Sequence, residues 1–334
     1  YIMSKQRIAV IGCGMWGRNI VRNFYNLGVL DTVCDMDEEH LKMVTDQYDG
    51  VKVTKDYKEV LNNPEITSVI VVTPSHTHFK LVKEFLDAGK NVYVEKPIST
   101  VAQEARDLTD LANKKGLVLM VGHLLLYHPA VNRLKMLIDE GELGEIVYAQ
   151  SDRLNVNYFK NDRSVMWDLA PHDVSLVSYV TSKNPVRVIS AVGCSSERNE
   201  IMDITHITLE FEGGMIGQIS DSWITPKKHV TLLVRGTKKT AILDDTVMEN
   251  KLQIFDNYAN NSVDIKLDYL EIEPLKLECQ HFVSCCENGG KARTDGENGY
   301  CVVKILEEAE KVMIGEKMVE LLDNHNFALS RLKQ

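Results

Sequence analysis

The chain has 334 residues, of which 44% are hydrophobic and 26% are charged, and its formal net charge is -10. This length and composition are those of a globular protein with room for two domains. The acidic balance argues against a nucleic-acid partner, and no apolar run approaches the roughly 18 residues that would span a membrane.

The amino terminus and the cysteines predict the compartment. The first residues, YIMSKQ, are too polar and too few to form a secretory signal peptide. The seven cysteines form no CxxC pair of the kind that binds metal, which predicts reduced thiols. We therefore expect a cytoplasmic protein that does not associate with membranes.

The first 122 residues alternate between strand and helix patterns. Short apolar runs predict strands at 7–12, 32–35, 68–74, 91–97 and 117–122, and helical stretches lie between them at 15–27, 38–48, 77–88 and 100–115. The run SVIVVTP (68–74) is almost continuously apolar, as expected for a parallel strand that is covered on both faces. The alternation predicts a doubly wound parallel sheet with right-handed crossovers.

Beyond about residue 145 the pattern changes. A long strand is predicted at 145–156 and a helix from Asp168 onward. Further strands are predicted at 186–192, 204–211, 215–222, 229–235 and 240–244, followed by helices near 274–287 and 298–313. FEGGM (211–215) and RGTKKT (235–240) are typical of hairpin turns. These short connections predict an α+β domain with a mostly antiparallel sheet.

The sequence GCGMWG (12–17) follows the first predicted strand and matches G-x-G-x-x-G. In this pattern Gly12 permits a tight turn, Gly14 lets the backbone approach a pyrophosphate, and Gly17 allows the helix to pack closely. The amino end of the helix supplies N–H groups and a positive dipole end for phosphates. The alternative is a glycine turn without a ligand. The residues predicted to contact a dinucleotide here are Gly12, Gly14, Met15, Trp16 and Gly17.

The second predicted strand ends at Asp35, about 20 residues beyond the glycines, where an acid binds the adenosine ribose of NAD. The carboxylate would repel the 2′-phosphate of NADP, so NAD is the predicted cofactor. Arg18 and Lys42 are cations nearby in the sequence and argue in the opposite direction.

The stretch WDLAPHDVSL (167–176) places Asp168 and His172 four residues apart. Pro171 lacks a backbone N–H, which predicts that it lies in the first turn of a helix, with Asp168 as the N-cap. Asp168 and His172 would then share one face of the helix. An acid and an imidazole held in this way suit proton transfer, whereas the structural alternative is a capping acid and a packed histidine.

VEKPIST (94–100) places Lys96 at the carboxyl end of a predicted buried strand, where open α/β sheets bind their ligands. A lysine at a strand end is usually a solvated charge. Beside a nicotinamide, however, its ammonium can stabilise a developing alkoxide.

Taken together, these motifs resemble the Gfo/Idh/MocA oxidoreductase family. The resemblance also includes VTPSHTH (72–78), VGHLLLYHP (121–129) and DSWITPKK (221–228), and it extends along almost the whole chain. It implies an α/β fold with a Rossmann NAD-binding domain, predicted at 1–122, and an open-faced substrate and oligomerisation domain, predicted at 123–334. Family members form oligomers through the large sheet, which implies a homodimer or homotetramer.

The resemblance also implies roles for individual residues. Lys96 matches the lysine of the EKP motif, in which it follows Glu95, and Asp168 and His172 match the family's Asp-x-x-x-His pair. His172 is the predicted general base, Lys96 holds the reacting oxygen, and Asp168 orients the imidazole or binds a second hydroxyl. The residues implied to lie beside the nicotinamide ribose are Thr73, Pro74 and His78, and Glu95 and Lys96 are also implied to contact the cofactor.

The predicted substrate is a nucleotide-linked sugar, because the form WDLAPHD is most similar to the branch that oxidises UDP-N-acetylhexosamines or their uronates at C3. The residues predicted to line its pocket are Lys96, Arg153, Asn155, Arg163, Trp167, Asp168 and His172. The guanidinium groups of Arg153 and Arg163 are predicted to receive the phosphates of such a substrate, and the alternative for both is an exposed surface charge. Inositols, free sugars and sugar phosphates remain alternative substrates, and a non-catalytic NAD-sensing regulator remains an alternative function.

HLLLYHP (123–129) lies between the two predicted domains, where many relatives carry an arginine that this chain lacks. His123 fits a hinge residue as well as a ligand. His76, His78, His123 and His128 have no carboxylate or thiolate in company, so no metal site is predicted.

Overall fold

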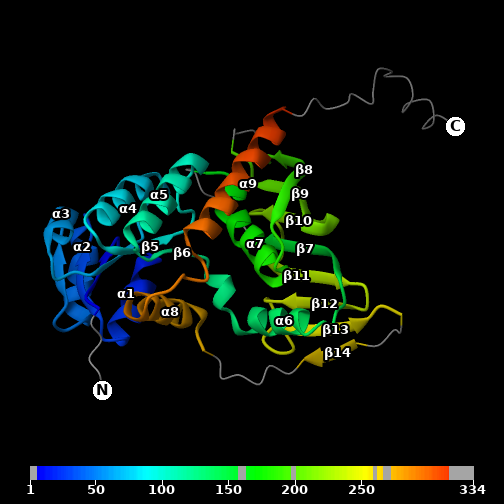
Figure 1. Cartoon of the computed structure of the whole chain (residues 1–334), viewed down its shortest axis with the longest axis horizontal. Coiled ribbons are helices and arrows are strands. Elements are labelled where there is room, and N and C mark those ends of the chain that lie inside the picture. The colour runs from blue at the N-terminus through cyan, green and yellow to red at the C-terminus, as the bar shows by residue number, and fades with distance from the viewer. Residues whose placement is uncertain (1–5, 157–162, 197–200, 259–261, 266–271, 316–334) are drawn as a thin grey trace.

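The computed structural model describes residues 6–156, 163–196, 201–258, 262–265 and 272–315. Within these ranges the strands form two sheets that lie side by side (Figure 1). Helix α9 (Gly296–Gly315) runs between them and contacts α5 and β6 on one side and α7 and β8 on the other.

The first sheet is parallel, as predicted, and its strand order is β3-β2-β1-β4-β5-β6. The strands are β1 (Ile8–Ile11), β2 (Leu30–Cys34), β3 (Lys52–Thr54), β4 (Ser68–Val71), β5 (Asn91–Glu95) and β6 (Leu119–Gly122). The order reverses between β1 and β4, and a crevice at such a switch point is where ligands of open α/β sheets bind. The sequence prediction missed β3, because this short edge strand is only partly buried.

Helices cover both faces of the first sheet. They are α1 (Gly17–Asn26), α2 (Glu38–Gln47), α3 (Tyr57–Asn62), α4 (His78–Asp87) and α5 (Ala102–Lys115). Along β1, Ala9 packs into the core with α4 and α5, whereas Ile8 packs into the core with α1. The predicted helices are confirmed, but α3 was not predicted.

A helix from the end of the chain completes this first core. Helix α8 (Pro274–Asn288) packs beside α1 (Figure 1), and its side chains Leu275, Cys279 and Phe282 join Ile8 and Val10 in one buried cluster. Residues far beyond 122 therefore contribute to the core of the first sheet, and the domain boundary at that position stays a prediction.

The second sheet is mostly antiparallel, as predicted, in the order β14-β13-β12-β11-β7-β10-β9-β8, with one parallel pair between β7 and β10. Its strands are β7 (Ile146–Leu154), β8 (Pro185–Cys194), β9 (Ile204–Phe211), β10 (Met215–Ser222), β11 (His229–Gly236), β12 (Lys239–Asp244), β13 (Leu252–Asp256) and β14 (Ser262–Ile265). Strands β13 and β14 were not predicted.

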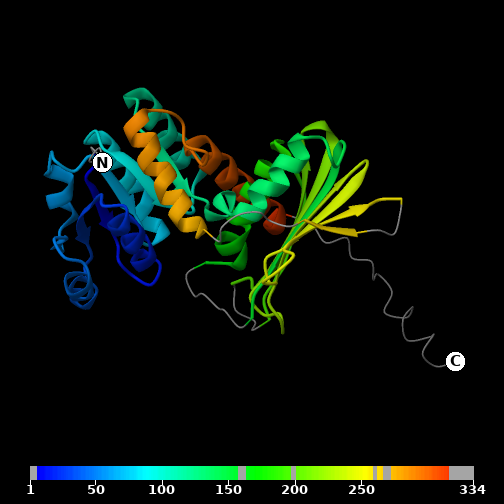
Figure 2. The same cartoon turned by 90° about the horizontal axis from the view of Figure 1, so that it is seen from below.

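Helices α6 (Pro129–Asp139), α7 (Val165–Thr181) and α9 pack on one side of the second sheet (Figure 2). Val147, Val186 and Val192 are exposed apolar side chains on its strands, which fits an open-faced sheet. The sequence prediction missed α6, although Pro129 at its first position and the His128 ring that accepts a hydrogen bond from the Ala130 amide are typical of a helix start.

The predicted start of α7 is wrong. The helix begins at Val165 with Ser164 as its N-cap, so Asp168 lies in the first turn and Pro171 lies inside the helix. Val165 and Met166 are buried, and their packing extends the helix backwards despite the hydrogen bond that a proline cannot donate. Asp168 and His172 still lie one turn apart on the same helix.

No helix in the described part of the chain combines the length and the apolar character needed to cross a membrane. All seven cysteines are free thiols.

Candidate active site

The glycine-rich loop has the tight geometry that its sequence predicts. Gly12 has a φ of +99°, and a Cβ placed there would lie 2.4 Å from the Val72 carbonyl oxygen. A Cβ on Gly17 would lie 2.3 Å from the Gly12 carbonyl oxygen, so α1 packs directly against the turn. The position of a Cβ on Gly14 has no described atom within 4 Å, which leaves its backbone open to a ligand.

The amino end of α1 is suited to phosphate. Among the described residues no side chain caps this end, and no acidic residue lies in the first turn. Its orphan N–H groups and positive dipole end are therefore available to an anion. The open backbone at Gly14 and this uncapped helix end fit the pyrophosphate of a dinucleotide.

Asp35 follows β2 and its carboxylate folds back against the glycine-rich loop. One oxygen accepts a hydrogen bond from the Cys13 amide at 2.5 Å, and the other accepts one from the Asp37 amide at 2.9 Å. His40 approaches the same carboxylate at 3.3 Å. The negative charge thus lies beside the predicted cofactor loop, as the discrimination between NAD and NADP requires.

Trp16 connects the glycine-rich loop to the end of β5. Its indole N–H donates to Glu95 Oε1 at 2.8 Å, whereas its neighbour Met15 is exposed. Glu95 also accepts from the Tyr93 hydroxyl at 3.0 Å and from the Lys96 amide at 3.3 Å. Burial raises the pKa of Glu95, and the hydrogen bonds from Trp16 and Tyr93 oppose this rise.

His78 lies beneath the site, with its side chain buried. Its ring nitrogens lie 2.7 Å from the Pro97 carbonyl oxygen and 2.8 Å from the Thr73 carbonyl oxygen. The imidazole therefore braces the loop that holds Thr73 and Pro74 against the loop after β5. Burial lowers the pKa of His78, and the nearby charge of Arg163 lowers it further.

Lys96 and Asp168 meet between the two sheets. Lys96 Nζ donates to the Asp168 carbonyl oxygen at 2.6 Å and lies 3.5 Å from Asp168 Oδ1. Both side chains are largely buried. His172 lies one turn further along α7, is partly buried, and has its Nδ1 atom shielded from solvent. The fold thus joins Lys96 to Asp168, and it places His172 one turn from Asp168 on the same helix.

Arg153 is not available for a substrate anion in this structure. Its guanidinium forms a bidentate pair with Asp173 at 2.8 and 3.0 Å, and Ser151 Oγ donates to the same carboxylate at 2.6 Å. Charge pairing with a buried carboxylate occupies the group that the sequence prediction assigned to phosphate.

The other predicted pocket residues have different surroundings. The Trp167 indole donates to Glu310 on α9 at 3.2 Å, and its ring packs against both cores. Asn155 pairs through its backbone with Ser222 and Thr225. Arg163 lies near enough to His78 for its charge to lower the pKa of that imidazole.

The sequence prediction assigned no role to Asp221. This fully buried residue on β10 pairs in register with Arg153 on β7, and neither carboxyl oxygen has a hydrogen-bond partner among the described residues. Burial and the charge of Asp173 raise its pKa well above the ordinary value. The DSW sequence that contains Asp221 belonged to the family resemblance, but its burial depends on the fold.

His123 follows β6 directly and is 1% exposed. Neither ring nitrogen has a hydrogen-bond partner within the described ranges, and burial beside the charge of Lys96 lowers its pKa to about 3. His123 is therefore a neutral imidazole next to the site. In the same segment the Tyr127 hydroxyl contacts Thr294 at 3.5 Å, and the His128 ring contacts Asp245 at 3.5 Å.

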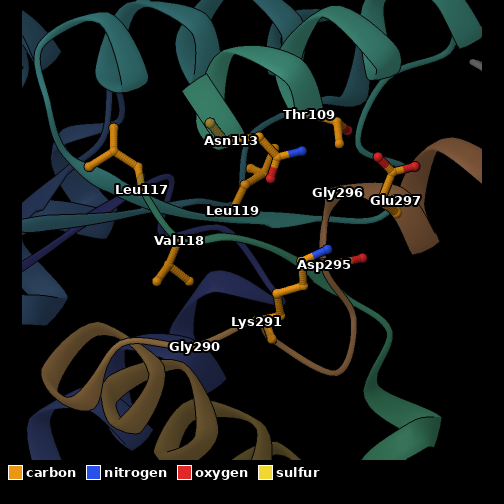
Figure 3. Close-up of a pocket in the computed structure, with 12 residues that line it drawn as sticks. Thr109, Asn113, Leu117, Val118, Leu119, Gly290, Lys291, Asp295, Gly296 and Glu297 are labelled. Carbon is orange, nitrogen blue, oxygen red and sulfur yellow. The ribbon is translucent and has the colours of Figure 1, made fainter. Parts of the chain in front are cut away.

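A small hollow lies away from these groups, between α5, the start of β6 and the chain that leads into α9 (Figure 3). Thr109, Asn113, Lys291 and Asp295 border it, and its volume of about 50 Å³ suits one or two water molecules rather than a sugar. No cluster of three or more metal-ligating side chains occurs among the residues that the structure describes.

Two family matches cover most of the chain. Residues 6–123 match the Gfo/Idh/MocA oxidoreductase family with an NAD-binding Rossmann fold, and residues 131–242 match the Gfo/Idh/MocA carboxyl-terminal domain. Both matched regions contain residues of the site described above.

Individual relatives differ in what they act on. The chain is 26% identical over 299 residues to scyllo-inositol 2-dehydrogenase (NAD⁺) of Bacillus subtilis, a match that covers 85% of this chain and 86% of that protein. It is 26% identical over 254 residues to UDP-N-acetylglucosamine 3-dehydrogenase of Acidithiobacillus ferrooxidans, covering 76% and 78%.

The solved structure of that second relative aligns with a TM-score of 0.81 at 23% identity, over 92% of this chain and 97% of the other. Levoglucosan dehydrogenase in complex with NADH and levoglucosan aligns with a TM-score of 0.82 at 18% identity, over 93% and 98%. These structures share the fold. The two family matches and the named dehydrogenases among the relatives show that the chain belongs to the Gfo/Idh/MocA oxidoreductase family and is an NAD-dependent dehydrogenase.

Proposed function

We propose that the enzyme oxidises the C3 hydroxyl of a nucleotide-linked sugar, such as UDP-N-acetylglucosamine or its uronate. The observation that supports this chemistry is the contact between Lys96 Nζ and the Asp168 backbone, because it joins the end of β5 to the helix that carries His172. Lys96 also follows Glu95, which binds Trp16 of the glycine-rich loop, and this supports a role for Lys96 beside the cofactor.

Bound NAD supplies the hydride acceptor at C4 of its nicotinamide. Lys96 holds the reacting oxygen and stabilises the negative charge that develops on it. His172 takes the hydroxyl proton, and Nε2 is the receiving nitrogen, because Nδ1 is shielded from solvent. Asp168, in the first turn of α7, binds Lys96 and so holds it near the helix that carries His172.

The nucleotide is the finer part of the proposal. The 26% identity to UDP-N-acetylglucosamine 3-dehydrogenase supports it, as does Arg163, a cation in the neighbourhood of His78 whose guanidinium suits a diphosphate. The pairing of Arg153 with Asp173 favours a second candidate, a neutral polyol such as an inositol, because it removes one of the two predicted anion-binding groups. The similarity to an inositol dehydrogenase supports the same candidate.

A substrate panel separates these candidates. UDP-N-acetylglucosamine, its uronate, myo-inositol, scyllo-inositol, glucose and glucose 6-phosphate are each incubated with NAD⁺, and NADH absorbance is followed. Parallel reactions contain 2-oxoglutarate, which accepts the hydride from NADH that stays bound, and in these reactions the keto sugar and 2-hydroxyglutarate are measured by mass spectrometry in place of NADH. We expect activity with the UDP-sugars. Activity confined to inositols or free sugars contradicts the nucleotide-sugar proposal, and NAD binding without turnover on any sugar favours a regulatory protein.

A further inference from the structure

Helix α8 brings a carboxyl group into the core behind the cofactor loop. Glu278 is completely buried, and neither of its oxygens has a hydrogen-bond partner of ordinary geometry among the described residues. Phe282 follows one turn later and packs edge-on against the Tyr93 ring, with centroids 6.0 Å apart and planes at 78°. Residues four apart on a helix share a face, so Glu278 and Phe282 are both directed toward Tyr93.

The hydrogen bonds identify Glu95 as the ionised member of this cluster. Its oxygens accept from the Trp16 indole, the Tyr93 hydroxyl and the Lys96 amide. All of these groups act as donors here, which is the environment that a carboxylate requires. Tyr93 has a single proton on its hydroxyl, and that proton is used in the bond to Glu95.

Glu278 has the opposite surroundings. An ionised Glu278 would place a second buried anion near Glu95 without a donor of its own, at a large desolvation cost. Burial and the charge of Glu95 accordingly raise the pKa of Glu278 well above its ordinary value, against an opposing effect of Tyr93. A protonated Glu278 has one O–H to donate, and the Tyr93 oxygen has a lone pair to accept it.

The space around these groups is closely filled. A Cβ added to Gly122 on β6 would lie 2.6 Å from the Tyr93 hydroxyl oxygen and 2.9 Å from Glu95 Oε1. The absence of a side chain at Gly122 therefore leaves just enough room for the bond between Tyr93 and Glu95.

We propose that Glu278 is a positioning residue of the cofactor site: its protonated carboxyl donates to Tyr93, which directs the Tyr93 hydroxyl to Glu95, and Glu95 holds Trp16 and the glycine-rich loop. The effect on the cofactor rests on the proposed binding of NAD at this loop. Loss of the Glu278 proton turns the Tyr93 hydroxyl away from Glu95, which weakens the anchor of Trp16.

Other ionisable groups nearby do not mimic this behaviour. The phenols and thiol that face Glu278 from β5, from the turn after β6 and from α8 itself are Tyr93, Tyr127 and Cys279. Burial raises the pKa of each of them, so they keep their protons while Glu278 titrates.

The test compares Glu278→Gln and Glu278→Leu with wild type and with Glu287→Gln, a control on an exposed position of the same helix. The dissociation constant of NADH is measured by its fluorescence between pH 6 and pH 9.5. We expect wild type and the control to bind NADH about fivefold more weakly once Glu278 ionises, a change equivalent to the loss of one hydrogen bond. Glu278→Gln keeps a hydrogen-bond donor, so its NADH affinity should not fall at alkaline pH. Glu278→Leu has no donor, so it should bind NADH about fivefold more weakly than wild type does at pH 6, at every pH tested.

Thermal unfolding without cofactor gives a separate readout. A raised pKa in the folded state contributes stability that is present below the ordinary glutamate pKa of about 4.3 and is lost as the pH rises through the folded value. The unfolding midpoint of Glu278→Gln should therefore rise relative to wild type with increasing pH, whereas Glu287→Gln should show a constant difference.

The proposal is overturned if the NADH affinity of Glu278→Gln falls at alkaline pH as much as that of wild type. It is also overturned if the difference in unfolding midpoint between Glu278→Gln and wild type does not change with pH. This conclusion does not depend on whether Glu278→Leu folds. If wild type binds no NADH at any pH, the cofactor placement fails instead, and the unfolding profile still decides whether Glu278 is protonated.

Discussion

Lys96 Nζ lies 2.6 Å from the Asp168 carbonyl oxygen, and this contact bridges the two sheets at the candidate active site. Lys96 follows the last residue of a strand in the first sheet, and Asp168 lies in the first turn of the helix that covers the second. A side chain that holds the two halves together can also hold a substrate oxygen, because an ammonium has three donors.

The first prediction concerns catalysis. Lys96→Ala and His172→Ala should each lower turnover by roughly 10²–10⁴, the range found when general acid–base groups are removed. NADH affinity should change little, because the glycine-rich loop and α1 are intact in both variants, whereas Lys96→Ala should also lower the unfolding midpoint, because it removes the contact with buried Asp168. Stopped-flow rates, calorimetry with NADH and thermal unfolding measure these quantities. Wild-type turnover in either variant would remove that residue from the mechanism.

The second prediction concerns Asp168. Because Ser164 is the residue at the N-cap, Asp168→Asn should not cost the roughly 1 kcal/mol of a lost helix cap. The amide keeps an oxygen near Lys96 but removes the charge, so we expect turnover to fall more than stability. Measuring kcat and the unfolding midpoint together checks this. A large loss of stability at unchanged kcat would restore the capping interpretation.

The third prediction concerns the choice of cofactor. The Asp35 carboxylate faces the Cys13 amide, so purified protein should bind NAD(H) more tightly than NADP(H). Asp35→Ala should reduce this preference, since it removes the charge that repels a 2′-phosphate. Calorimetry with both cofactors on both proteins measures the ratio. Tighter binding of NADP(H) than of NAD(H) by wild type would contradict the assignment of NAD as the cofactor.

The fourth prediction separates the two arginines. Arg153→Ala leaves buried Asp173 without its partner and should reduce the free energy of unfolding by about 3 kcal/mol. Arg163→Ala should raise KM for a UDP-sugar, while KM for a neutral polyol stays the same. Denaturant unfolding and steady-state kinetics distinguish these outcomes. Equal effects of Arg163→Ala on both substrate types would contradict a role in binding the diphosphate.

The fifth prediction concerns pH. Burial and Lys96 lower the pKa of His123 to about 3, so this residue stays neutral across the working range of an enzyme. In the folded protein the His123 imidazole becomes charged only in strong acid, so its charge does not change between pH 6 and pH 9. His123→Asn should therefore leave the pH dependence of kcat/KM unshifted. A moved acid limb would show that His123 titrates in the active enzyme.

Local patterns explain what could be predicted from the sequence. The turn at Gly12, the close approach at Gly17 and the location of Asp35 follow from residues within one β-α-β unit. Lys96 and His172 could be proposed as catalytic residues because their motifs are short and contiguous, whereas the contact between Lys96 and Asp168 depends on the fold.

The features that could not be predicted from the sequence depend on packing between segments that are distant in the chain. Helix α7 begins early because Val165 and Met166 are buried by segments distant in the sequence. Arg153 meets Asp173 because β7 lies against α7, and Glu278 reaches Tyr93 because α8 returns to the first sheet. Periodicity and spacing carry no information about such pairings.

The central claim is hydride transfer from C3 of a nucleotide-linked sugar to NAD, supported by Lys96 and His172. UDP-N-acetylglucosamine deuterated at C3 is mixed with NAD⁺ and excess wild-type enzyme, the protein is denatured after a single turnover, and the released cofactor is analysed by mass spectrometry. Denaturation removes the difficulty of tightly held NADH. We expect the NADH formed by wild type to carry deuterium, and we expect Lys96→Ala and His172→Ala to form almost no NADH. Unlabelled NADH, or no NADH from this substrate or its uronate, would contradict it.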